Sequence, residues 1–318
     1  MENIYFRIRK NINACFLYDS LRDAVSYFVG RRPLRKSATE ISPPPFFIVG
    51  SGRSGNTLLR AILTGHPNVS IPPESYVLGR VIRQFGSYSF LDWKVLLRLV
   101  LSEFEYHHQF ETWDISLRSV YNKIRRLPEE ERDLAHILDG VYRKYIDRHM
   151  SSATRWGDKT PVNTFHLDWI DRVFPEARYV HMVRDGRDVV GSYLKSEIYT
   201  SVEKALYRWK RSIKIAKEFR GKNEGKVIEI KYEDLVQYPE NEIPIVCEFL
   251  NIDFSEDMLE FQSDVEELGD THLSHHRGLK RPINTSSIGS WKNRLTESQK
   301  RKVMTEASGM LNNLGYVK

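Results

Sequence analysis

Two segments of the chain combine residue types that bind phosphate groups. The first, GSGRSGNT at residues 50–57, follows the apolar run FFIV and precedes the helix-like stretch NTLLRAILTG. A strand, a glycine-rich turn and a helix in this order bring backbone amides together at a helix N-terminus, where the helix dipole favours an anion. The segment therefore predicts a phosphate site, although a glycine and serine turn without a ligand is the plainer alternative.

The first segment departs from the Walker pattern of nucleoside triphosphatases at one position. Gly50, Gly55 and Thr57 stand where that pattern has its glycines and its Ser/Thr, but Asn56 replaces the lysine. Arg53, inside the loop, offers a positive charge instead. Because the Walker lysine reaches the β- and γ-phosphates of a triphosphate, its absence favours a terminal or 5′-phosphate.

The second segment, RDGRDVVGS, follows the expected strand ARYVHMV. It places Arg184 at the end of that strand and Ser192 two turns along the next helix, and both side chain types bind phosphate. Asp185 and Asp188 allow a different interpretation, in which one of them holds a kinase metal. We favour the interpretation that they cap the helix and pair with Arg187 or neighbouring bases.

The elements around these segments predict an α/β fold with a parallel sheet flanked by helices. Strands expected at 46–49, 177–183 and 226–231 alternate with helices, whereas residues from about 85 to 150 read as an all-helical insertion. Ligands of such sheets bind at the carboxyl ends of the strands. Both phosphate-binding segments are expected at that edge.

Composition excludes several classes of protein. The chain has 318 residues, 48 Lys plus Arg, 42 Asp plus Glu and two cysteines, which is ordinary for a globular protein and not for a disordered chain, a collagen or a disulfide scaffold. Residues 1–40 hold eight basic and four acidic residues, so most of the net charge of +6 lies there. The rest of the chain mixes both signs, and we expect no nucleic-acid partner.

Residues 1–40 are expected to form an amphipathic, basic helical segment before a single domain over 41–318. Apolar residues recur there near helical spacing, but charges interrupt them, so the segment reads neither as a membrane span nor as a signal peptide. It would either dock on the body of the protein or let residues 1–36 contact an anionic membrane. We expect a cytoplasmic protein, with or without peripheral membrane contact.

Five blocks together resemble sulfotransferases that use 3′-phosphoadenosine 5′-phosphosulfate (PAPS), with spacing closest to the tyrosylprotein and related bacterial branch. The blocks occur in the family's order and are VGSGRSGNTLLRAILTGHPNVSIPPES, WGDKTP, VRDGRDVVGSYL, KYEDL and GSWKN. The resemblance implies a P-loop NTPase-like fold, PAPS as co-substrate without a metal, and in-line transfer of a sulfuryl group to a hydroxyl acceptor. The acceptor stays open among peptides, sugars, lipids and natural products.

The resemblance also implies which residues bind the donor. The 3′-phosphate would lie on Arg184 and Ser192, and Tyr232 of KYEDL matches a nucleotide contact. The 5′-phosphosulfate would lie on the first loop, through Arg53, Ser54, Gly55, Asn56 and Thr57, of which Asn56 replaces the usual threonine. We expect the Asn56 amide to donate to the phosphate and so to keep binding, with altered strength.

One donor-binding feature of the cytosolic sulfotransferases is missing from this chain. Their downstream basic triplet is replaced by Asn284, Thr285 and Ser286. Arg281, a basic residue before a proline, is the candidate substitute, and Asn284 is retained as a candidate nucleotide contact.

The resemblance assigns the reacting groups as well. Glu74 in PPES, 21 residues after Arg53, matches the glutamate that acts as base, and Lys159 in WGDKTP matches the lysine aimed at the transferring group. Arg53 and Lys159 would stabilise that group and the leaving phosphate. The plainer alternatives are a surface glutamate and a solvated lysine beside Asp158. His275 stands where this branch supplies a serine, and could be a second base or a donor to the sulfuryl oxygens.

Two other functions stay open at this point. A nucleotide or small-molecule kinase of P-loop type would use Asp185 or Asp188 with magnesium and would fail without the metal, whereas a sulfotransferase would tolerate a chelator. A nucleotide-binding module without catalysis is supported only by Asn56 and by the missing basic triplet.

Overall fold

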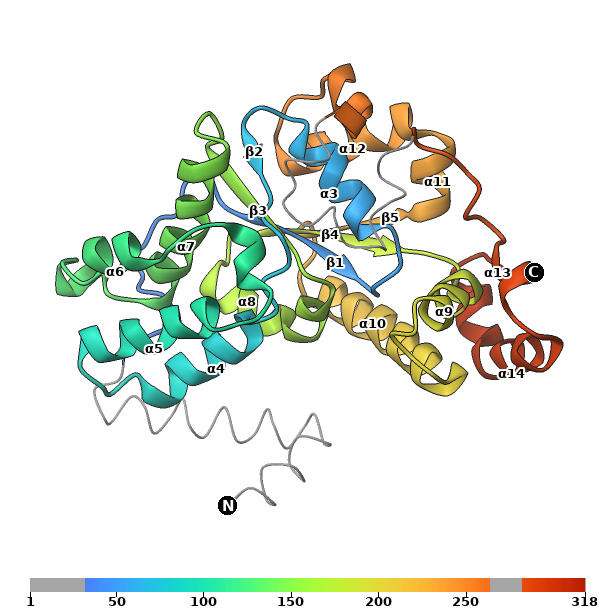
Figure 1. The fold of residues 1–318 in the computed structure, drawn as a ribbon, viewed down its shortest axis with the longest axis horizontal. Coiled ribbons are helices and arrows are strands. Elements are labelled where there is room, and N and C mark those ends of the chain that lie inside the picture. Colours follow the sequence, from blue (N-terminus) through green and yellow to red (C-terminus); the bar gives the residue numbers. More distant parts are fainter. Residues whose placement is uncertain (1–31, 264–281, 318) are drawn as a thin grey trace, which may run out of the picture.

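A parallel sheet lies at the centre of the protein (Figure 1), in a computed structural model that describes residues 32–263 and 282–317. The strand order is β2-β3-β1-β4-β5, and every neighbouring pair is parallel. The strands are β1 (Phe46–Gly50), β2 (Val69–Ser70), β3 (Arg155–Lys159), β4 (Arg178–Val183) and β5 (Val227–Lys231). The predicted fold class, an α/β protein with a P-loop NTPase-like sheet, is confirmed.

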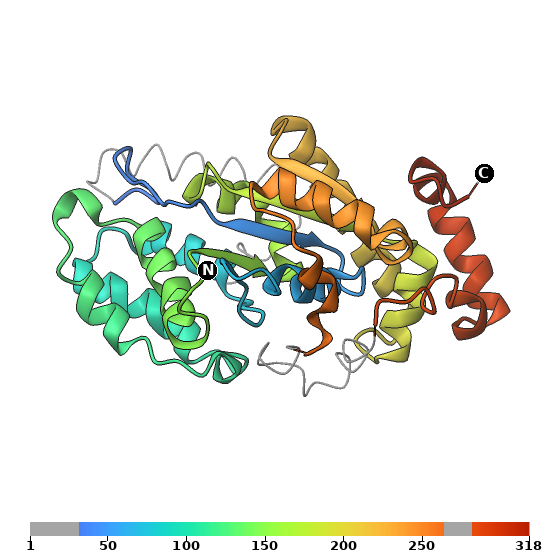
Figure 2. The ribbon, with the colours of Figure 1, turned by 90° about the horizontal axis from the view of Figure 1, so that it is seen from above.

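The central strand β1 is buried on both faces because its side chains alternate between two clusters of the core. Phe46 and Ile48 join the cluster made with α3 (Asn56–Thr64), α11 (Tyr232–Gln237) and α12 (Pro239–Leu250). Phe47 and Val49 face the opposite cluster, which includes α8 (Leu167–Val173) and α10 (Val202–Lys222). The view from above shows helices on both sides of the sheet (Figure 2).

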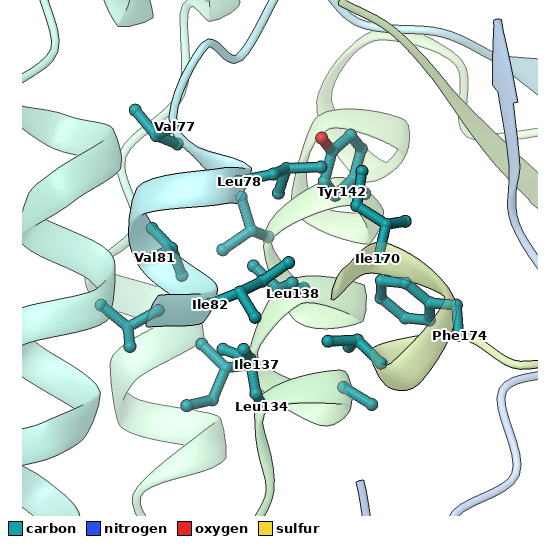
Figure 3. Close-up of a cluster of buried hydrophobic side chains, with 14 of the residues drawn as sticks. Val77, Leu78, Val81, Ile82, Leu134, Ile137, Leu138, Tyr142, Ile170 and Phe174 are labelled. Atoms are coloured by element: carbon teal, nitrogen blue, oxygen red, sulfur yellow. The ribbon is translucent and has the colours of Figure 1, made fainter. Parts of the chain in front are cut away.

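The expected helical insertion is present between β2 and β3. Its helices are α4 (Leu78–Tyr88), α5 (Trp93–Glu105), α6 (Arg118–Ile124) and α7 (Leu134–His149), with 3-10 turns at η1 (Phe110–Trp113) and η2 (Glu129–Glu131). The helices begin at Leu78, earlier than the expected boundary near 85, because Leu78, Val81 and Ile82 pack against α7. Figure 3 shows this contact, in which the facing helix contributes Leu134 and Leu138.

The remaining helices follow β3, β4 and β5 in the chain. They are η3 (Pro161–His166), α9 (Gly186–Lys195), η4 (Glu256–Ser263), α13 (Trp291–Arg294) and α14 (Glu297–Asn313). Helix α14, expected from its sequence, begins with a capping box between Thr296 and Gln299. Its apolar side packs in a cluster with α9 and α10.

Two features differ from expectation or lie outside the described residues. The sequence does not predict strands β2 and β3, because β2 is very short and the WGDK part of β3 is polar. Residues 32–40 contain no helix, and residues 1–31, which carry the rest of the predicted N-terminal segment, lie outside the described part. In residues 32–263 and 282–317, no helix is both long enough and apolar enough to cross a membrane.

Candidate active site

A residue of the candidate site stands at or just beyond the carboxyl end of every strand. Glu74 follows β2, Lys159 ends β3, the first loop follows β1, Arg184 follows β4 and Tyr232 follows β5. Since the strands are parallel, these positions share one edge of the sheet. A pocket of about 420 Å³ lies there, lined among others by Gly52, Arg53, Gly55, Asn56, Thr57, Glu74, Arg184, Tyr232 and Asn284.

The first loop requires glycine at two of its positions. Gly50 has φ +141°, and a Cβ there would lie 2.4 Å from the Met182 carbonyl oxygen on β4. Gly55 has φ +91°, and a Cβ there would lie 2.5 Å from the ring of Tyr232. Left-handed backbone and close approach both exclude larger residues. The loop therefore turns tightly into α3, as a phosphate-binding loop does.

The Asn56 side chain forms a hydrogen bond within the first loop. It is buried, and its Nδ2 donates to the Ser51 carbonyl oxygen at 2.8 Å. One of the two N–H donors of this amide is therefore used within the loop, and a bond from the other to a phosphate stays a prediction. Ser54 is also buried, and its hydroxyl has no hydrogen-bond partner among the described residues.

The two phosphate-binding segments form one basic cluster. Arg53 Nε donates to Ser192 Oγ at 3.0 Å, and Arg184 Nη1 donates to the Arg53 carbonyl oxygen at 3.1 Å. The Arg184 guanidinium also lies 4.1 Å from the centre of the Tyr232 ring. Burial, followed by the positive charge of Arg184, lowers the pKa of Arg53. Two arginines held this close favour binding of an anion between them.

The two aspartates of the kinase interpretation have structural roles. Asp185 caps α9 by accepting from the Arg187 backbone N at 2.9 Å, and it forms an ion pair with the Arg187 guanidinium at 2.6 Å. Asp188 is fully buried and accepts from Gly289 N and Trp291 N, each at 2.8 Å. The expected capping and pairing are confirmed for Asp185. For Asp188 the pairing with a base is wrong, because its printed hydrogen bonds come from neutral groups of residues 289–291.

The described lining of the pocket includes neither aspartate. It does not include Ser192 or Lys159 either, but these two residues bond to Arg53 and Glu74, which do line the pocket.

Glu74 and Lys159 meet at the edge of the pocket. Lys159 Nζ forms an ion pair with Glu74 Oε1 and donates to Thr57 Oγ1 at 3.3 Å. The Lys159 side chain is 0% exposed and that of Glu74 is 16% exposed. The alternatives of a solvated loop lysine and a surface glutamate are therefore wrong. A carboxylate and an ammonium beside an anion pocket can serve as a proton acceptor and as a stabiliser of developing negative charge.

The downstream candidates are only partly described. His275 and Arg281 lie outside the described residues. Asn284 is exposed and lines the pocket, but its amide is engaged locally, because Nδ2 donates to the Pro282 carbonyl oxygen at 3.0 Å and Oδ1 accepts from Ser286 N at 3.2 Å. A contact from Asn284 to a nucleotide stays a prediction.

The pocket also contains aromatic residues that the motifs do not single out. Tyr193 directly follows Ser192, bonds Ser51 through its hydroxyl at 3.1 Å, and packs edge-on against Tyr199 at 4.9 Å. Tyr76, two residues after Glu74, has the left-handed backbone angle φ 56° and also lines the pocket. The signal that could have found them is their position next to the motif residues.

The sheet, the glycine loop and the basic cluster define an α/β protein with a P-loop-like fold and an arginine-lined pocket at the carboxyl edge of its sheet. The model of the sulfotransferase family matches residues 44–256. The chain therefore belongs to the sulfotransferase family. It is a transferase of sulfuryl groups, and the kinase alternative is not favoured.

Relatives with assigned names agree with this membership. The chain is 28% identical over 279 residues to a putative protein-tyrosine sulfotransferase of Caenorhabditis briggsae, covering 85% of this chain and 88% of the relative. It is 26% identical over 288 residues to protein-tyrosine sulfotransferase 1 of Homo sapiens, covering 86% of this chain and 70% of the relative.

A solved structure shares the fold. The sulfotransferase domain of the Synechococcus PCC 7002 olefin synthase aligns with a TM-score of 0.57 at 24% identity, over 87% of this chain and 98% of that domain.

Proposed function

We propose that this sulfotransferase uses PAPS as donor and transfers its sulfuryl group to a hydroxyl acceptor by in-line displacement. The observation that carries the proposal is the position of Arg53, Ser192 and Arg184 in one cluster beside the Glu74 and Lys159 pair. A nucleotide phosphorylated at two places supplies two anionic groups for such a cluster. The same pocket offers a base for the acceptor next to it.

Each donor phosphate has its own partners in this proposal. Arg53, Thr57 and the backbone amides of the first loop hold the 5′-phosphosulfate. Arg184 and Ser192 hold the 3′-phosphate, and Tyr232 packs beside it. The bond from Arg53 to Ser192 joins the two subsites.

The proposed reaction is a single displacement at sulfur. The acceptor hydroxyl oxygen forms the new bond to sulfur while the bond between sulfur and the 5′-phosphate oxygen breaks. Glu74 takes the hydroxyl proton, and Lys159 and Arg53 stabilise the negative charge that develops on the leaving oxygen. Since Lys159 holds Glu74 in the structure, we expect Lys159 to turn toward the leaving oxygen as the acceptor contacts Glu74.

The acceptor we propose to try first is the phenolic hydroxyl of a tyrosine in a peptide. The names of the relatives, which are protein-tyrosine sulfotransferases, support this choice. Sugars, lipids and natural products are the comparison acceptors in the same screen.

Calorimetric titration tests the donor. With EDTA present, 3′,5′-bisphosphoadenosine (PAP), adenosine 5′-phosphate and ATP are titrated into the wild type and Arg184→Ala. We expect the wild type to bind the bisphosphate tightly and the variant to lose that preference. Radiolabelled PAPS then tests transfer to a tyrosine peptide, again with EDTA. Equal or tighter binding of ATP, or binding only with magnesium, would contradict the proposal.

A further inference from the structure

One buried carboxylate beside the site has no part in the proposed chemistry. Asp158 is 1% exposed and immediately precedes Lys159 on β3. Its two oxygens accept hydrogen bonds from four neutral side chains: Tyr142 at 2.6 Å, Asn163 at 2.8 Å, Ser75 at 3.2 Å and Thr160 at 3.2 Å. Burying a carboxylate that is held only by neutral donors costs folding free energy, which indicates a specific role for Asp158.

The donors come from three different parts of the fold. Tyr142 belongs to α7 of the helical insertion, Ser75 to the segment after β2, and Thr160 and Asn163 to the stretch after β3. The Thr160 hydroxyl also accepts from the Ser75 backbone N at 3.1 Å. The segment after β2 is therefore attached to the end of β3 by both its main chain and its side chain.

The Tyr142 ring is itself held firmly. It stacks on Trp156 of β3 at 4.1 Å between ring centres, with 15° between the planes. Figure 3 shows Tyr142 at one end of the apolar cluster, with its hydroxyl oxygen pointing away from Leu134 and Ile137. The insertion thus presents one oriented hydroxyl donor to Asp158.

The network adjoins both reacting groups. Ser75 follows Glu74 directly, and Asp158 and Thr160 flank Lys159. Fixing Ser75 against Asp158 and Thr160 consequently fixes the backbone that carries Glu74 relative to the backbone that carries Lys159. Burial raises the pKa of Asp158, and the bonds from Tyr142 and its other donors oppose that rise.

We propose that Asp158, with Tyr142 and Ser75, is a positioning network that sets the geometry of the Glu74 and Lys159 pair and ties it to the helical insertion. The inference rests on the proposed function, because it assigns that pair to sulfuryl transfer. Asp158 acts through its neighbours and does not touch the donor or the acceptor.

The first test measures turnover and donor binding separately in variants of the network. Tyr142→Phe and Ser75→Ala each remove one donor with little change in volume, and Asp158→Asn replaces an acceptor oxygen with a donor. With PAPS and the tyrosine peptide of the acceptor screen, we expect kcat to fall about tenfold or more while the dissociation constant of PAP changes less than about twofold. Tyr145→Phe, at another buried tyrosine of α7, is the matched control and should keep kcat.

The second test asks whether the network acts through Glu74. Tyr142→Phe is measured in the wild type and in Glu74→Gln. We expect its effect on kcat to be much smaller in the Glu74→Gln background, because the base is gone and only the position of Lys159 can still be disturbed. An equal fold-loss in both backgrounds, or an unchanged kcat in Tyr142→Phe, overturns the inference.

The four proteins of the second test are the wild type, Tyr142→Phe, Glu74→Gln and the double variant. They also separate this inference from the proposed function. If the wild type transfers no sulfuryl group from PAPS to any acceptor in the screen, the proposed function fails. Urea unfolding of the four proteins then still decides about the network, since positioning of Glu74 predicts non-additive losses of stability and independent sites predict additive ones.

Discussion

Arg53 and Ser192 are 139 residues apart in the chain, yet Arg53 Nε donates a hydrogen bond to Ser192 Oγ at 3.0 Å. The contact exists because β1 and β4 are neighbours in the sheet, so the loop after β1 lies beside the helix after β4. It brings two separate sequence motifs into one basic cluster. Substitutions in and around this site should therefore separate donor binding from turnover.

Arg184 should determine recognition of the 3′-phosphate. We expect Arg184→Ala to weaken PAP binding about tenfold or more, since a charged hydrogen bond is worth roughly 1.5–3 kcal/mol. Adenosine 5′-phosphate binding should weaken less, through the lost bond to the Arg53 carbonyl oxygen. Calorimetry measures both. Arg187→Ala is the matched control, because Arg187 pairs with Asp185 and is not among the described residues that line the pocket. An equal loss for both nucleotides would place the 3′-phosphate elsewhere.

Glu74 and Lys159 should affect turnover much more than donor binding. We expect Glu74→Gln to lower kcat about 100-fold or more, as removal of a general base does, while the PAP dissociation constant stays within about threefold. Lys159→Ala should lower kcat similarly. Steady-state kinetics with PAPS provides the measurement, and Glu297→Gln, at an exposed residue of α14, is the control. Full activity in Glu74→Gln would assign the base to another group.

Gly55 should tolerate no side chain. Its φ is +91°, and a Cβ added there would lie 2.5 Å from the Tyr232 ring, so Gly55→Ala must shift the loop or the ring. We expect PAP affinity to fall about tenfold or more. Gly221→Ala, on α10 with no described atom within 4 Å of its Cβ position, is the control and should be neutral or slightly stabilising. Unchanged PAP affinity in Gly55→Ala would mean that this loop does not hold the donor.

His136 should make stability depend on pH. Its hydrogen bond with Asp133, at 3.0 Å, raises the pKa of His136 above the ordinary 6.5. A raised pKa means that the protonated imidazole stabilises the folded state at low pH, and that this contribution is lost as the pH rises through the folded-state pKa. The loss of unfolding free energy in His136→Gln should therefore be largest below the ordinary pKa of 6.5 and should shrink over the pH range above it.

Urea unfolding across that range measures this effect. His108→Gln, which removes an exposed imidazole, is the control. A difference between wild type and His136→Gln that does not vary with pH would show that the Asp133 contact contributes no proton linkage. Asp133 also accepts a hydrogen bond from the Lys36 backbone N at 2.9 Å. This bond attaches the segment before β1 to the N-terminus of α7.

Local patterns were sufficient for much of the fold. The apolar runs of β1 and β4 and the periodic helices α3, α7 and α10 are visible in the sequence because burial of a strand or of a helix face leaves a regular spacing of apolar residues. The order of motifs also predicted the sulfotransferase family. The same reasoning missed β3, because Arg155 and Lys159 are charged and only their neighbours in the sheet make them buried.

The sequence by itself therefore determined the α/β class and the residue types available in the two loops, for which it predicts phosphate binding. Only the tertiary structure decided that Asn56 braces its own loop, that Glu74 holds a buried Lys159, and that Asp158 collects four donors. The reason is physical. Residue type and short-range spacing set local backbone preference and chemistry, whereas burial and hydrogen-bond partners depend on which distant strands become neighbours.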